Sequence, residues 1–167
     1  MSYVILHKNP AIMDDKNVKI LFRFFSDVLD EWTVETLWSE TVDVEKGLYK
    51  LMSIPFLAYV SCEDIVFAEY DQDEEMLTYR RTIEHSGNST IQVFVRDKEI
   101  VTNDLREIFS SLGCESEKFR EGYFVIKVPK SLNYKPIREK LMDLEEQGKI
   151  GYAEPNLAEN HFYFATN

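Results

Sequence analysis

The side chains of this protein that could do chemistry are carboxylates, and they are concentrated in two windows. Residues 27–45 contain seven acidic side chains and no basic one, and residues 63–75 also contain seven acidic side chains and no basic one. Carboxylates at this density can ligate a hard cation such as Ca²⁺, or they can attract a basic partner. The spacing of the acids decides between these two kinds of chemistry.

The densest acidic run, residues 71–75, does not fit a calcium loop. A loop of the EF-hand type that starts at Asp71 requires glycine at its sixth position and glutamate at its twelfth. This sequence has Met76 and Thr82 at those positions. The run is therefore predicted to be the tip of a hairpin, and no metal or cofactor is expected.

Nucleophilic chemistry and zinc binding also lack a complete set of residues. His85 and Ser86 are neighbours and Cys62 follows a serine, but none of them has the flanking glycines of a nucleophile elbow. The two cysteines, Cys62 and Cys114, and the three histidines are too scattered for a zinc site. We expect free thiols, no catalytic residues and a protein that is not an enzyme.

The charge is unevenly distributed along the chain. The net charge is −11, and residues 1–95 hold 17 acidic and 8 basic residues, whereas residues 96–167 hold 13 and 11. This balance disfavours direct binding to nucleic acid or to an anionic membrane. Negative charge gathered in the first half favours a basic protein partner, and the alternative that it serves only solubility stays open.

The residues predicted to contact such a partner are acids of the two windows and two aromatic residues that could anchor it. Trp32, like Trp38, could instead be a core residue. The predicted contact residues are Asp27, Asp30, Glu31, Trp32, Glu35, Glu63, Asp64, Tyr70, Asp71, Asp73, Glu74 and Glu75.

Short strands are predicted to carry both windows. Alternating and β-branched or aromatic residues, separated by polar turns, recur at a spacing of about ten residues, which is typical of a small antiparallel β-barrel or curled sheet. This β-rich acidic lobe is expected to span residues 1–89. Its predicted strands are 18–25, 35–42, 47–54, 56–60, 65–70 and 76–83.

The second half, residues 90–167, is predicted to alternate strands and helices. A first helix capped by Thr102 or Asn103 ends at Gly113, and a second follows Asn133 and ends near Gly148. The remaining predicted strands are 91–95, 114–120, 123–128 and 150–154, and Pro155 is expected to end the last of them. The tail, residues 160–165, is expected to dock on the first half. Strand, helix, strand, strand, helix, strand is the ferredoxin-like order, so the fold class is α+β.

Several short motifs carry a family resemblance. They are Tyr49–Phe56, Glu63–Val66, Ser86–Thr90, Leu112–Cys114, Val128–Pro129 and Tyr152–Pro155. In them the chain resembles a bacterial family catalogued as domain of unknown function 4265, over roughly residues 18–157. No catalytic residues are established for that family, so the resemblance implies none here.

In size, charge and compartment the chain is similar to immunity proteins of bacterial toxin systems, including contact-dependent growth inhibition. The leading hypothesis is an immunity protein that binds and neutralises a cognate toxin, expected to be a basic nuclease domain, through its acidic surface. The alternatives are a small-molecule-binding regulatory domain of ferredoxin-like type and an uncharacterised enzyme. Residues 1–8 lack a basic leader and no apolar window is long enough to span a membrane, so a cytoplasmic protein is expected.

Overall fold

The computed structural model describes the backbone of residues 4–6 and all of residues 16–163. The chain forms two compact units, Met1–Ser86 (unit 1) and Gly87–Asn167 (unit 2). The predicted boundary, between residues 89 and 90, lies three residues further along the chain. Each unit contains its own sheet and its own cluster of buried apolar residues.

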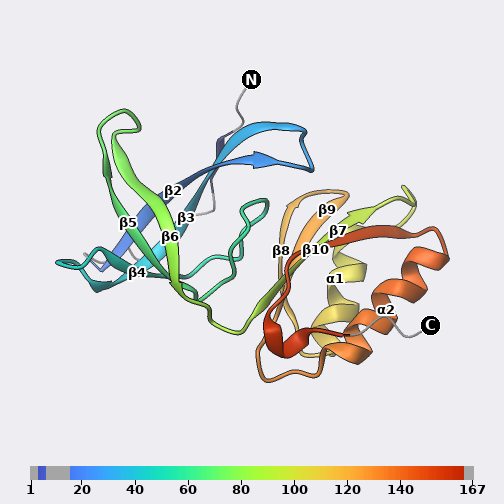
Figure 1. Cartoon of the computed structure of the whole chain (residues 1–167). Helices are drawn as coiled ribbons and strands as arrows, with labels where there is room; N and C mark the ends of the chain where they lie inside the picture. The colour runs from blue at the N-terminus through green and yellow to red at the C-terminus, as the bar shows by residue number, and fades with distance from the viewer. Residues whose placement is uncertain (1–3, 7–15, 164–167) are drawn as a thin grey trace. The chain divides into compact units, whose positions relative to one another are not determined.

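Unit 1 is a curled, mainly antiparallel sheet, as the strand spacing predicted. Its strands are β1 (Val4–Leu6), β2 (Asn17–Ser26), β3 (Glu31–Asp43), β4 (Leu48–Leu51), β5 (Ile65–Asp71) and β6 (Met76–Glu84). The strands from β2 to β6 pair in the ring order β3-β2-β6-β5-β4, and β4 pairs with β3 again. The β2–β6 pairing is parallel and joins Leu21 to Thr78. In Figure 1 the β2–β3 and β5–β6 hairpins extend from this sheet.

The interior of unit 1 is filled by alternate residues of the strands. Ile20 and Phe22 of β2 face Leu37 of β3, and all three are buried among residues from β4 and β5. Because side chains alternate between the two faces of a strand, the intervening residues lie on the outer face of the sheet. In the middle of β2 and β3 that other face is covered too, since Leu21, Val34 and Trp38 are buried, whereas Phe25, Val28 and Trp32 at the end of this hairpin are exposed.

The predicted strand at residues 56–60 is wrong. These residues belong to the loop between β4 and β5. The backbone N–H groups of Phe56, Leu57 and Ala58 donate to the carboxylate of Glu35, at 2.6–3.0 Å, instead of to a neighbouring strand. A buried carboxylate here satisfies the donors that a sheet would otherwise satisfy, so the apolar composition of the segment does not produce a strand.

Unit 2 contains four antiparallel strands and two helices. Its elements are β7 (Ser89–Val95), α1 (Thr102–Ser111), β8 (Glu115–Arg120), β9 (Tyr123–Val128), α2 (Tyr134–Glu146), β10 (Ile150–Asn156) and the short 3-10 helix η1 (Glu159–His161). The sheet order is β10-β7-β9-β8, and both helices lie on one face of the sheet (Figure 1). That face buries Ile91 and Val93 of β7 and Phe124 of β9 against Phe109 of α1 and Leu141 of α2.

The start of α1 differs from the prediction. The helix begins at Thr102 after Val101, and no side chain of either predicted cap residue caps it. Instead, the N–H and the hydroxyl of Thr102 donate to the Glu121 carboxylate from the β8–β9 turn, at 3.2 and 2.8 Å. The other predicted helix signals are confirmed: Asn133 accepts a hydrogen bond at the start of α2, and Gly113 follows α1 with a φ of 95°.

Strand β10 and the tail give two further corrections. Pro155 does not end β10, which continues to Asn156. The strand lies at a sheet edge and its register shifts between Ala153 and Asn156, so a residue without an N–H is tolerated there. The tail, expected to dock on the first half, instead makes its recorded contacts with unit 2. His161 is buried, with Nδ1 2.6 Å from the hydroxyl of Ser89; residues 164–165 of the predicted segment lie outside the described residues.

Candidate protein-binding surface

The end of the β2–β3 hairpin exposes large apolar side chains. Phe25 and Trp32 lie directly opposite each other in the two strands, and their ring centroids are 6.2 Å apart with an interplanar angle of 83°. Trp32 is 59% exposed, and Val28 in the turn is exposed as well. Aromatic and apolar side chains held rigidly at a surface are the residues that most often anchor protein partners.

A residue from the β4–β5 loop joins this hairpin end. The Tyr59 hydroxyl donates to Asp27 Oδ2 at 2.7 Å, and the Tyr59 ring packs edge-on against Phe24 with centroids 5.9 Å apart. Burial, together with the hydrogen bond to Asp27, raises the pKa of Tyr59, so the phenol stays protonated and remains a donor. Tyr59 therefore fixes the position of the Asp27 carboxylate without neutralising it.

Asp27 and Asp30 give the hairpin end its negative charge. Both are exposed, and within residues 16–163 no ion pair is recorded for either of them. Asp30 adopts a φ of 52° in the turn, a conformation that aspartate tolerates better than most residues. We call Phe25, Asp27, Val28, Asp30, Trp32 and Tyr59 the hairpin surface. It combines exposed apolar area with two carboxylates for which no ion pair is recorded.

Three of the seven acids in the second acidic window form ion pairs with arginines of the chain. Arg80 bonds both Glu69 and Asp71 at 2.9 Å, and Arg23 bonds Glu74 at 2.6 Å. The hydrogen bond from Arg80 is the main reason why the pKa of Asp71 lies below its ordinary value. Residues 71–75 of this window form the β5–β6 hairpin tip, as predicted, and the remaining exposed members of the window are Tyr70, Asp73 and Glu75.

Two predicted contact residues are not at the surface. Glu35 is 0% exposed, and its carboxylate holds the β4–β5 loop. Asp64 is also buried, and its two oxygens accept the N–H groups of Ser61 and Ser86 at 2.9 and 2.8 Å. A buried carboxylate that is saturated with backbone donors stabilises the fold and cannot meet a partner. Four predicted contact residues of the first window lie together at the hairpin end: Asp27, Asp30, Glu31 and Trp32, of which Glu31 is half-buried. Glu63, from the second window, is half-buried in a turn.

Three members of the hairpin surface were not predicted as contact residues. Phe25 lies just before the polar turn that follows the predicted strand 18–25, and Val28 lies within that turn. A hairpin turn at residues 27–30 would have predicted that Phe25 lies opposite Trp32. Tyr59 carries no such signal. Its role depends on the loop that Glu35 holds, and no local pattern in the sequence reveals that contact.

The residues considered for nucleophilic chemistry do not form a catalytic set. His85 is exposed, with Nδ1 3.9 Å from Asp64 Oδ2, and the Ser86 N–H is bound by the same carboxylate. Cys62 is buried, with its sulfur 3.9 Å from the Leu51 carbonyl oxygen. Among the described residues there is also no cluster of three or more His, Cys, Asp or Glu residues with the geometry of a metal site.

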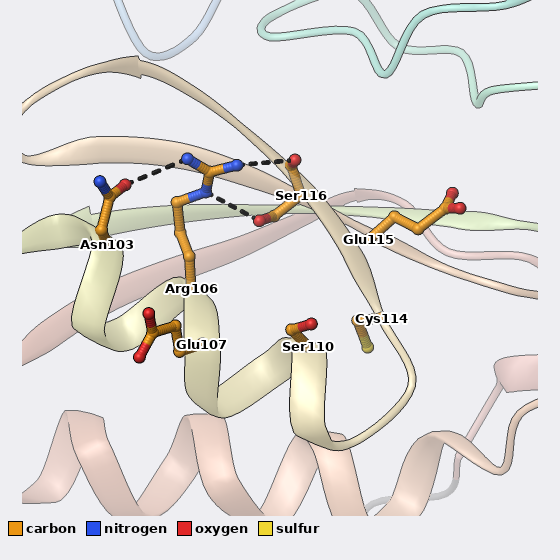
Figure 2. A pocket seen from close by; sticks show the side chains of 7 residues that line it. All are labelled: Asn103, Arg106, Glu107, Ser110, Cys114, Glu115 and Ser116. Atoms are coloured by element: carbon orange, nitrogen blue, oxygen red, sulfur yellow. Dashed lines mark hydrogen bonds between the residues drawn. The ribbon is translucent and has the colours of Figure 1, made fainter.

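A hollow of about 480 Å³ lies between α1 and the edge strand β8 in unit 2 (Figure 2). Arg106 crosses it and donates to Asn103 Oδ1, to Ser116 Oγ and to the Ser116 carbonyl oxygen, at 2.9–3.1 Å. Burial raises the pKa of the Cys114 thiol to about 12, so the thiolate needed of a nucleophile does not form near neutral pH. The hydrogen bonds of Arg106 tie α1 to β8.

The exposure and charge of the hairpin surface predict how Trp32 fluorescence responds to ionic quenchers. Trp32 is exposed and Trp38, the other tryptophan, is buried, so a quencher in solution reaches mainly Trp32. We expect the ratio of Cs⁺ quenching to I⁻ quenching to be higher than it is for N-acetyl-tryptophanamide at low salt, because the carboxylates of the hairpin end attract cations and repel anions. The measurement is a pair of Stern–Volmer titrations. The double variant Asp27→Asn, Asp30→Asn should reduce the difference, and equal relative quenching by both ions would contradict the charge assignment.

The fold is shared with a known structure. A crystal structure of a hypothetical protein from Neisseria gonorrhoeae matches with a TM-score of 0.74 and 23% identity, over 87% of this chain and 99% of that one. The likeness defines a class of mixed α/β fold with two helices and two antiparallel sheets, one of them curled. Neither helix of the described residues has the length and apolarity needed to cross a membrane.

The family follows from the sequence. Residues 35–152 match the family described as "Domain of unknown function (DUF4265)", and the chain belongs to that family. The resemblance seen in the short motifs is thereby confirmed. Comparison with curated proteins finds no match to this chain.

Proposed function

We propose that this protein binds a basic protein partner through the hairpin surface, and that it acts in the cytoplasm as an immunity protein that neutralises a cognate bacterial toxin. The observation that supports a binding role is that one hairpin end carries the exposed Trp32 together with the exposed Asp27 and Asp30. A desolvated aromatic anchor contributes affinity, and unpaired carboxylates attract the lysines and arginines that a nuclease uses to hold nucleic acid. Occupying those cations would block the nuclease.

The hairpin surface, and not the second acidic window, is the better site for electrostatic steering. Charge reversal at Asp71 or Glu74 would break the ion pairs with Arg80 and Arg23, so its effect on binding could not be separated from its effect on the fold. Neutralising Asp27 and Asp30 to asparagine breaks no recorded ion pair, and it leaves an amide oxygen that can accept the hydrogen bond of the Tyr59 hydroxyl. These two positions therefore give the cleaner test.

Capture of the partner tests the proposed function. The tagged protein is incubated with lysate of its native host at low salt, and the captured protein is identified, purified and tested for toxin activity with and without this protein. We expect a basic toxin whose activity is inhibited. The variant Asp27→Asn, Asp30→Asn should slow association with it at least about fivefold at low salt, with a smaller change in the dissociation rate.

The variant Asp73→Asn provides the control, because Asp73 is an exposed acid in the other window. It should leave both rate constants within about a factor of two. A captured partner that binds the Asp27, Asp30 double variant as fast as it binds the wild type would exclude the hairpin surface. A partner without inhibited activity would exclude the immunity role.

A small-molecule-binding regulatory role is the second candidate, and a hollow in unit 2 favours it. We propose the ferredoxin-like type for this unit, supported by its element order and by the sheet order β10-β7-β9-β8. The hollow, of about 290 Å³, is lined at one end of α2 by Tyr134, Lys135 and Arg138 and on the other side by His161 and Tyr163. A metabolite that raises the melting temperature of the protein would support this role.

A further inference from the structure

We propose that a hollow beside α2 in unit 2 binds a small organic anion, in which a phosphate or a carboxylate is attached to a flat apolar group. The hollow has a volume of about 290 Å³, and Lys135, Arg138 and Tyr163 are among the residues that line it. We call it the α2 hollow. This inference rests on the regulatory role proposed above as the second candidate function, and it names the class of ligand that this role requires.

Both charged side chains that line the α2 hollow, among the described residues, are cations. Lys135 and Arg138 lie three residues apart on α2, a spacing that places side chains on the same side of a helix. His161, which also lines the hollow, is uncharged near neutral pH because burial lowers its pKa. In a chain of net charge −11, a hollow lined by two cations favours anions over other ligands.

The carboxylates near these cations do not occupy them. The Glu154 carboxylate accepts hydrogen bonds from two tyrosine hydroxyls, at 2.6 and 2.7 Å, and no ion pair joins it to Arg138 in the part of the chain that the structure describes. The Glu139 carboxylate lies 3.9 Å from the Lys135 ammonium, and these side chains are 63% and 78% exposed. Such an exposed pair contributes little energy, so an anion in the hollow can attract the ammonium at small cost.

Arg138 has hydrogen-bonding capacity that the described residues do not use. Its guanidinium carbon lies 3.7 Å from the centre of the Tyr163 ring, and its Nε is buried with no hydrogen-bond partner among the described residues. A buried donor without an acceptor destabilises the structure, and a bound ion that completes the site would explain it. Stacking occupies one face of the guanidinium and leaves the N–H groups at its edge, which match the oxygens of a phosphate or a carboxylate.

Side chains, and not the backbone at the start of α2, provide these donors. The Lys135 N–H already donates to the Asn133 side chain at 3.0 Å, and Pro136 has no N–H. The backbone donors that commonly bind anions at a helix N-terminus are therefore reduced here. Loss of either cationic side chain should consequently remove a large part of the binding.

Aromatic rings give the α2 hollow apolar walls that are already in place. The ring of Tyr134 lies 6.3 Å from that of Tyr163 and 5.8 Å from that of His161, measured between centroids. Phe162, which is 64% exposed, also lines the hollow. Small-molecule sites combine such walls with a few polar groups and have volumes of about 300–1,000 Å³, so a hollow of about 290 Å³ suits a small ligand.

Calorimetric titration of the full chain near neutral pH, at constant ionic strength, tests this inference. The probes are phenyl phosphate and benzoate, with benzylamine as a cationic control of similar size. We expect both anions to bind and benzylamine not to bind, and phenyl phosphate to bind at least about threefold more tightly than benzoate, because its second charge interacts with two cations. The reverse order would identify a carboxylate as the preferred group.

Matched variants locate the binding. Lys135→Gln and Arg138→Gln should each raise the dissociation constant of phenyl phosphate at least about fivefold. Lys98→Gln removes an exposed cation of unit 2 that does not line the α2 hollow, and it should change this constant by less than about twofold. The Lys135 side chain is 78% exposed, so Lys135→Gln keeps the test decisive even if Arg138→Gln fails to fold.

The outcomes separate this inference from the proposed functions. Binding that is equally tight in the wild type and in Lys135→Gln, or equally tight for benzylamine, overturns the inference. Failure of both anions to bind overturns it as well, whereas a neutral or cationic metabolite that raises the melting temperature would still support a regulatory role. The double variant Asp27→Asn, Asp30→Asn, which alters unit 1, should leave the affinity for phenyl phosphate unchanged, so this result is independent of the partner capture.

Discussion

Replacing Glu35 by alanine is expected to lower the free energy of unfolding of unit 1 by roughly 3 to 5 kcal/mol. The Glu35 carboxylate accepts three backbone hydrogen bonds, from Phe56, Leu57 and Ala58, and all four residues are buried. Each buried donor left without an acceptor costs about 1–3 kcal/mol. The measurement is urea denaturation followed by Trp38 fluorescence in a Trp32→Phe background, because Trp38 is buried in unit 1.

Two further variants sharpen this test. Glu35→Gln keeps the shape and one oxygen but places an amide NH₂ among the donors, so it should cost about 2 kcal/mol or more. Glu45→Ala removes an exposed acid in the β3–β4 turn and should change the stability by less than about 0.5 kcal/mol. A loss below about 1 kcal/mol for Glu35→Ala would show that the loop does not depend on this carboxylate.

Removing the hydroxyl of Ser89 is expected to destabilise unit 2 by roughly 2 to 4 kcal/mol. The buried Ser89 Oγ accepts the Ala158 N–H at 2.7 Å and lies 2.6 Å from His161 Nδ1, whose other ring nitrogen is 3.2 Å from the Leu132 carbonyl oxygen. A carbonyl only accepts, so Nε2 carries the proton and Ser89 donates to Nδ1. Ser89→Ala leaves an N–H and a ring nitrogen without partners.

The circular dichroism signal at 222 nm measures this change, because α1 and α2 both belong to unit 2. Ser131→Ala, at an exposed serine, is the control and should cost less than about 0.5 kcal/mol. If the Ser89 and Ser131 variants unfold at the same urea concentration, the network contributes nothing to stability.

The pH dependence of unit 2 provides a second readout of the same network. Burial lowers the pKa of His161, so the unfolded chain binds a proton at a higher pH than the folded one does. The contribution of neutral His161 is present in full above about pH 6.5 and is lost as the pH falls toward the folded pKa, by at most about 1.4 kcal/mol per pH unit. His161→Gln should reduce this slope, whereas His85→Gln, at an exposed histidine, should change it less.

Periodicity in the sequence was enough to predict most of the elements, because it reflects local burial. The alternation around Ile20 and Phe22 marks the interior face of β2, and the helical spacing around Leu105 and Phe109 marks the buried face of α1. Segments whose backbone N–H groups donate to a side chain far away in the sequence were not predictable from periodicity. Residues 56–60 have the composition of a strand, but the Glu35 carboxylate occupies their donors.

At the candidate site too, local features of the sequence were predictable and contacts with distant side chains were not. Composition correctly located the acidic windows but could not distinguish charged surface from neutralised surface. The Asp27 carboxylate accepts a hydrogen bond from the uncharged Tyr59 hydroxyl, whereas Glu74 is paired with Arg23, a residue 51 positions away. Glu35 is a member of the window by sequence and a core residue by structure. Pairing across such distances is set by the strand register, which the acids themselves do not encode.

The pairing of Leu21 with Thr78 has a consequence for synthesis on the ribosome. Unit 1 is closed by a contact between its second strand and its last one, and unit 2 is likewise fastened by Ser89 at its start and His161 near its end. Neither unit can complete its native contacts until its final segment has been translated. Each nascent unit therefore presents an open sheet edge for most of its synthesis, and its folding is expected to be slow and cooperative, since the decisive contacts join residues far apart in sequence.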